Sequence, residues 1–189
     1  SASAELRRRI PADTQTGMPS IEMIVRFLRQ TNCSRDTNNR DESKRMDYKA
    51  ERLLRSHLLW REKVRPDRLT VADCQTAMDS GVARFLGIGR QGNPVLWVQA
   101  KLWNPHEYDT QHMVRFVTYW LVLVERIMQQ NNCSTAILLM DVEGWAVWHA
   151  RYVSHLHELI TILQCHYPER LQCALLVNVP MIFTAAWNV

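Results

Sequence analysis

The sequence predicts an α/β fold in which a helical N-terminal region precedes a mostly parallel mixed sheet with covering helices. Two observations lead to this prediction. Apolar runs at about 136–140 and 175–179 are typical of strands buried on both faces. Helical spacing of apolar residues over about 110–130 and 149–165 precedes each run, which favours parallel strands joined by right-handed crossovers. The 189 residues, 47% hydrophobic and 22% charged, fit one domain or one domain with a small appendage.

The N-terminal third reads as helices separated by polar sequence. Residues 1–17 are expected to form a flexible tail. Helical spacing predicts helices over about 21–30 and 43–63, and the polar stretch 32–42 predicts a solvated loop between them. The expected organisation is a tail over 1–17, a helical subdomain over 18–69 and an α/β core over 70–189.

The core begins with a short helix and two strands. Thr70 and Asp73 have capping-box spacing, which predicts a short helix that reaches about Ser80. Strands are expected at 82–88 and 95–101. The glycines of Gly87–Gly92 match G-x-G-x-x-G, but a strand follows them instead of a helix, so they predict a turn and not a dinucleotide site.

Charge, cysteines and histidines limit the classes of function. Residues 1–68 hold 16 Lys/Arg and 10 Asp/Glu, a net charge of +6, whereas residues 69–189 hold 7 and 9, a net charge of −2. A basic first third suits an anionic membrane surface, nucleic acid or an acidic partner; a solvated helix face is the simpler alternative. The five cysteines include no C-x-x-C pair and the histidines lack metal-ligand spacing, so no metal site is expected and a reducing compartment fits. The apolar run at 116–124 is too short to span a membrane, and the N-terminus lacks a secretory pattern.

Two further features allow alternative interpretations. Asp141 and Glu143 follow a predicted buried strand, where a carboxylate pair could serve acid–base catalysis in an α/β enzyme; a turn with a helix cap is the alternative. Trp145 and Trp148 could anchor a membrane interface, or could simply pack.

Several short motifs occur in an order and spacing that resembles the CRAL-TRIO lipid-binding domain family over about residues 18–189. This family includes phosphatidylinositol/phosphatidylcholine transfer proteins and carriers of retinaldehyde and tocopherol. The most specific element is the Tyr-Pro-Glu-Arg sequence followed by Asn-x-Pro. The motifs are Arg26-Phe27-Leu28-Arg29, Trp60-Arg61, Gly92-Asn93-Pro94-Val95, Met140-Asp141-Val142-Glu143-Gly144, Tyr167-Pro168-Glu169-Arg170-Leu171 and Asn178-Val179-Pro180.

The resemblance implies a small N-terminal helical bundle and a sheet that forms the floor of an apolar pocket, where one lipid lies under a gating helix. It implies no catalysis and no cofactor other than a bound lipid. Since family members continue well past Trp187, the resemblance also implies a C-terminal truncation. Glu169 is the expected polar contact with the ligand, with a structural salt bridge to an arginine as the alternative. The expected lipid-binding wall residues are Phe85, Leu96, Val98, Ala136, Leu138 and Met140.

The sequence also departs from the family's headgroup sites. Thr31 stands where phosphoinositide-binding members have an arginine, and Ala136 and Leu138 stand where choline-binding members have polar residues. The ligand, a phospholipid or another lipid, therefore stays open. The expected function is to bind one hydrophobic ligand and transfer or present it at anionic membranes, from a cytoplasmic, membrane-peripheral location and without nucleic acid. The alternative is a protein-interaction or regulatory module with no transferable lipid.

Overall fold

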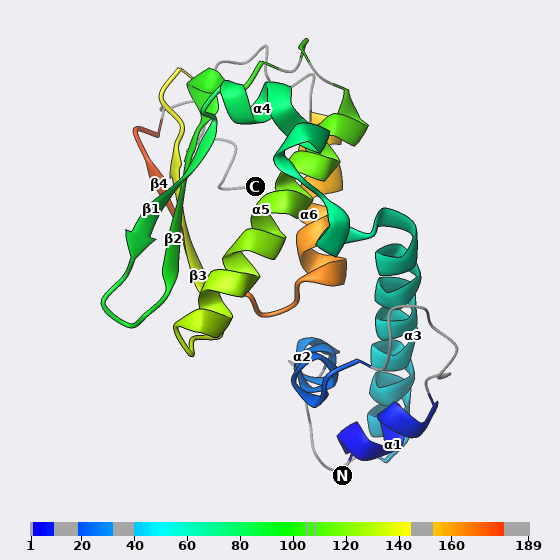
Figure 1. Ribbon diagram of the computed structural model, residues 1–189. Helices are drawn as coiled ribbons and strands as arrows, with labels where there is room; N and C mark the ends of the chain where they lie inside the picture. The colour runs from blue at the N-terminus through cyan, green and yellow to red at the C-terminus, as the bar shows by residue number, and fades with distance from the viewer. Residues whose placement is uncertain are drawn as a thin grey trace. The chain divides into compact units, whose positions relative to one another are not determined.

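The structure is a computed structural model that describes residues 2–9, 19–31, 40–104, 106–107, 109–144 and 153–179. The chain forms two compact units. The first unit contains Ser1–Arg65 and Thr161–Glu169, and the second contains Pro66–Ile160 and Arg170–Val189. Figure 1 shows the elements of both units along the chain. Residues 161–169 thus join the helical N-terminal region, although the sequence places them in the core.

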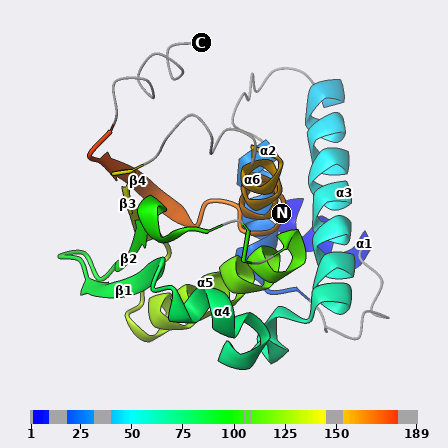
Figure 2. The same ribbon diagram turned by 90° about the horizontal axis from the view of Figure 1, so that it is seen from above.

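The described part of the first unit contains the helices α1 (Ala2–Arg9), α2 (Ile21–Thr31) and α3 (Arg40–Val64), together with the end of a later helix from Thr161 onward. Figure 2 shows them from a second direction. Their shared core is apolar and consists of Leu6, Ile24, Phe27, Leu28, Ala50, Leu54 and Leu58.

The expectation of a flexible tail over 1–17 is wrong for residues 2–9, which form α1. Leu6 is only 3% exposed because it packs into the core of the first unit. One leucine among arginines has no visible periodicity, so the sequence pattern does not reveal this helix. The helix α3 begins at Arg40, inside the expected loop, and residues 32–39 lie outside the described part of the chain.

The second unit begins with the turns η1 (Pro66–Arg68) and η2 (Val71–Cys74) and the short helix α4 (Gln75–Asp79). The capping box is confirmed, because the backbone N–H of Thr70 donates to the Asp73 carboxylate at 2.8 Å.

A four-stranded mixed sheet follows, as predicted: β1 (Ala83–Ile88), β2 (Pro94–Gln99), β3 (Ala136–Asp141) and β4 (Leu171–Val177). The strands lie side by side in the order β1-β2-β3-β4 (Figure 1). β1 pairs antiparallel with β2, whereas β2, β3 and β4 are parallel. The turn η3 (Ala100–Leu102) ends β2.

The glycine-rich segment is confirmed as the turn between β1 and β2. The N–H of Gly89 donates to the carbonyl of Asn93 at 2.7 Å, and Gly92 takes a φ of +84°. Only glycine adopts such a φ at little cost. No helix N-terminus is available here to bind a phosphate.

Two helices connect the parallel strands: α5 (Thr110–Gln130) between β2 and β3, and α6 (Val153–His166) between β3 and β4. The Asp109 side chain caps α5 by accepting from the N–H of His112 at 2.7 Å. The helix α5 contributes Met113, Phe116 and Trp120 to a core that includes Cys74 and Val82.

The prediction that 175–179 is buried on both faces is wrong for its described side chains, because Leu175 is 52% exposed. The strand β4 lies at an edge of the described sheet, where fewer neighbours cover a side chain. The strand also begins at Leu171, earlier than expected. The sequence pattern did not reveal this start because Gln172 interrupts the run of apolar residues.

Candidate functional site

The strand register brings the six predicted wall residues onto one face of the sheet. Phe85 pairs with Leu96 across β1 and β2, and Leu96 pairs with Leu138 across β2 and β3. Val98 pairs in the same way with Met140. Side chains at alternate positions of a strand share a face, so Ala136 lies on this face as well. We call these six residues the wall residues; their contact with a lipid remains a prediction.

The protein's own helices cover part of this face. Leu96 and Val98 pack against the core to which α5 contributes Phe116 and Trp120. Phe85, on the edge strand β1, is 40% exposed. The wall is therefore packed by protein in its centre and open to solvent at the β1 edge.

Polar groups that sequence reasoning missed lie within α5. The Trp120 Nε1 and the Thr118 hydroxyl are buried and have no hydrogen-bond partner among the described residues. Trp120 belongs to the core beside the wall, whereas Thr118 lies on another side of α5 by helical spacing. Thr118 interrupts the apolar run at 116–124, and that interruption is the only sequence signal for it.

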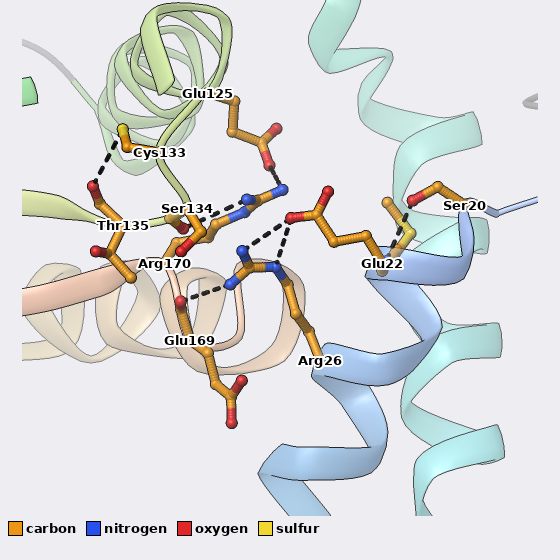
Figure 3. A network of polar contacts seen from close by, with 10 residues as sticks. Ser20, Glu22, Arg26, Glu125, Cys133, Ser134, Thr135, Glu169 and Arg170 are labelled. Carbon is orange, nitrogen blue, oxygen red and sulfur yellow. Dashed lines mark hydrogen bonds and ion pairs between the residues drawn. The ribbon is translucent and has the colours of Figure 1, made fainter. Parts of the chain in front are cut away.

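In the first unit, Glu169 is held by its backbone. The Arg26 guanidinium, 9% exposed, donates from Nη1 to the Glu169 carbonyl at 2.7 Å (Figure 3). The same guanidinium donates from Nη2 to the Glu22 carboxylate at 2.9 Å. Glu169 has a φ of +54°, in the left-handed region. Arg26 thus stabilises a backbone conformation that a non-glycine residue rarely adopts.

The Glu169 carboxylate is exposed and points away from Arg26 (Figure 3). The alternative of a salt bridge to an arginine is not formed among the described residues. Within the second unit, the next residue, Arg170, pairs with Glu125 at 2.9 Å. The Glu169 side chain is therefore accessible to a ligand, and its role as a polar contact stays a prediction.

Thr31 takes part in ordinary helix packing. Its buried hydroxyl donates to the carbonyls of Phe27 at 3.2 Å and Leu28 at 3.0 Å, one turn earlier in α2. Threonine carries no charge, and its hydroxyl already bonds within the helix. This position therefore offers no charged donor to a headgroup phosphate.

The largest aromatic cluster of the first unit lies beside the Tyr167–Glu169 segment. The Trp60 and His166 rings stack with centroids 4.2 Å apart, and Tyr167 meets Trp60 edge-on at 6.0 Å. His57 is 2% exposed, and its ring lies 5.6 Å from that of His166. Burial lowers the pKa of His57 to about 3 and that of His166 to about 4. Both rings are neutral near pH 7 and pack as aromatic side chains.

Asp141 and Glu143 form a turn, the alternative to a catalytic pair. The buried Asp141 carboxylate accepts from the Asn178 amide at 2.9 Å and from the N–H of Glu143 at 3.1 Å, and these bonds lower its pKa. Glu143 pairs with Lys101 at 2.7 Å, and this hydrogen bond raises the lysine pKa. The two carboxylates have separate partners and do not share a proton. Trp145 and Trp148 lie outside the described residues.

Within the described part of the chain, no three His, Cys, Asp or Glu side chains gather in a way that could hold a metal ion. None of the described helices combines the length and apolar character needed to cross a membrane.

The chain is similar in sequence to curated proteins. The Phosphatidylinositol transfer protein CSR1 of Eremothecium gossypii is 29% identical over 114 residues, which cover 59% of this chain and 25% of that protein. Patellin-6 of Arabidopsis thaliana is 22% identical over 149 residues, which cover 72% of this chain and 36% of that protein. The chain thus spans between a quarter and about a third of the length of these relatives.

A solved structure has the same fold. The crystal structure of Sfh5 matches with a TM-score of 0.63 and 18% sequence identity, covering 99% of this chain and 73% of that one. The family model described as CRAL/TRIO domain matches residues 78–189, more than half of the chain. The chain therefore belongs to the CRAL/TRIO domain family.

Proposed function

We propose that this chain binds one lipid against the wall residues and transfers or presents it at membranes without catalysing a reaction. The observation that carries the proposal is the register of β1, β2 and β3, which aligns apolar side chains in cross-strand rows. Neighbouring strands lie about 4.8 Å apart, so rows across these three strands offer an apolar surface roughly 10 Å wide. Each lipid CH₂ buried there contributes about 0.8 kcal/mol.

Family membership and the name of the relative CSR1 support a lipid as the ligand. They leave its headgroup open, because Thr31 offers no cation and the wall residues Ala136 and Leu138 carry no polar group. Glu169, which belongs to the first unit, stays a separate prediction of a polar contact, and binding at the wall residues of the second unit does not depend on it. We therefore propose only that the ligand is one molecule of a phospholipid or of another lipid.

A second function has its own supporting observation. Leu96 and Val98 already pack against the core that α5 shares, so the protein itself fills part of the wall. A protein-interaction or regulatory module with no transferable lipid would need no further cavity beside the wall residues.

Native mass spectrometry of the purified chain, before and after denaturation, separates the two functions. We expect one additional lipid mass in the native state that is lost on denaturation, and lipid extraction should identify it. A native mass equal to that of the bare polypeptide, in a folded sample supplied with lipid vesicles, would favour the interaction module.

A matched pair of variants locates the lipid. Leu138→Trp places a bulky ring on the wall face, whereas Leu139→Trp places the same ring on the opposite face of the same strand. We expect the first variant to lower lipid occupancy and the second to retain it, with far-UV circular dichroism showing that both are folded. Equal occupancy in the two variants would contradict binding at the wall residues.

A further inference from the structure

One face of α3 combines positive charge with two large exposed apolar side chains. At about 100° per residue, six exposed residues fall within an arc of roughly 100°. We call this surface the α3 strip; it consists of Tyr48, Lys49, Arg52, Ser56, Leu59 and Lys63.

The apolar members of the α3 strip are unusually accessible. Tyr48 is 68% exposed and Leu59 is 64% exposed, the highest values among the large hydrophobic residues that the structure describes as exposed. The opposite face of α3 is buried by Ala50, Leu54 and Leu58 in the core of the first unit. The exposure therefore belongs to a helix that is firmly packed on its other side.

The cations of the α3 strip have no counter-ion among the described residues. Lys49, Arg52 and Lys63 form no ion pair with any residue that the structure describes. Among the α3 residues whose side chains the structure describes, Tyr48 to Val64, the acidic ones are Glu51 and Glu62, and they lie on the flank of the strip by helical spacing.

Two arginines near the α3 strip, Arg9 and Arg55, are paired with carboxylates, unlike the cations of the strip. Arg55 bonds Glu51 at 2.9 Å, and Arg9 of α1 pairs with Glu5 and contacts Glu51 at 3.9 Å. Arg9 and Arg55 are therefore paired with carboxylates, whereas the three cations of the α3 strip have no such partner among the described residues.

We infer that the α3 strip docks on an anionic phospholipid surface. The rise of about 1.5 Å per residue makes the distance from Tyr48 to Lys63 roughly 22 Å along a straight helix, which suits a flat surface. Cations attract the anionic headgroups, and Tyr48 and Leu59 insert between them, as in helices that lie in the membrane interface. This surface lies on the first unit and the proposed lipid site on the second, so each can fail without the other.

The test is binding to phosphatidylcholine vesicles with and without phosphatidylserine, measured by co-sedimentation at low salt. Each cation near such a surface is worth about 1 kcal/mol, so Lys49→Gln, Arg52→Gln and Lys63→Gln combined should weaken binding about 100-fold. Salt should weaken the wild-type interaction, since the Debye length falls to about 8 Å at physiological ionic strength.

The matched control lowers the net charge equally at other exposed positions, with Arg29→Gln, Arg68→Gln and Arg90→Gln combined. We expect the control to bind the vesicles nearly as the wild type does. Equal weakening by both triple variants would reduce the effect to net charge and overturn the inference.

The apolar part has a separate test. Tyr48→Ser with Leu59→Ser should weaken vesicle binding at physiological salt, whereas Ile21→Ser with Ile160→Ser, also exposed, should not. Wild-type binding to poly-glutamate but not to the vesicles would show a surface for acidic proteins and refute membrane docking. Measuring the bound lipid in every variant distinguishes loss of docking from loss of the proposed cargo.

Discussion

The buried His57 leads to a quantitative prediction of acid sensitivity in the first unit. Its ring is 2% exposed, and neither ring nitrogen has a hydrogen-bond partner among the described residues. Burial, followed by the nearby charges of His166 and Arg61, lowers the pKa from 6.5 to about 3. The unfolded chain therefore binds a proton more readily than the folded chain between these two pH values.

The sign and size follow from this difference in pKa. Because the folded pKa lies below the unfolded one, the full stability is present above pH 6.5 and falls as the pH is lowered toward 3. One pH unit corresponds to at most about 1.4 kcal/mol for one group, and the unfolded histidine is only half protonated at pH 6.5. The free energy of unfolding should therefore fall by about 2 kcal/mol between pH 6.5 and about 4.5. His166, with a pKa of about 4, acts in the same direction.

The variant His57→Phe retains an aromatic ring and removes the proton. We expect urea unfolding of the variant to lose about 2 kcal/mol of the pH dependence that the wild type shows over this range. The control His106→Phe changes an exposed histidine and should keep the wild-type dependence. A His57 ring that titrates near pH 6.5 in an NMR titration would refute the burial argument.

Two further predictions concern polar contacts. Arg26→Met should lower the free energy of unfolding by about 2 kcal/mol, since it removes the charged donor of the Glu169 carbonyl; urea unfolding measures this, and a loss below about 0.5 kcal/mol would show that the bond contributes little. Glu143→Gln should change the free energy of unfolding by less than about 1 kcal/mol, because its pair with Lys101 is exposed; a larger loss in thermal unfolding would contradict this.

Elements whose signal is local could be predicted from the amino-acid sequence alone. The repeat of apolar residues predicted α2 and α5, and the apolar run predicted β3, because both patterns depend on residues a few positions apart. The Tyr-Pro-Glu-Arg and Asn-x-Pro motifs indicated the family that the comparisons confirm. The glycine turn also followed from its immediate neighbours.

Features that depend on residues far apart in the sequence became visible only in the folded chain. Leu6 makes α1 part of a core only because α2 and α3 provide the partners. The face shared by the wall residues is set by pairing between strands about 40 residues apart, such as Leu96 with Leu138. Arg26 meets the Glu169 carbonyl across 143 positions of sequence. Burial, register and desolvation are properties of the folded surroundings, so a local pattern supplies the candidate residues and the packed chain decides which of them meet.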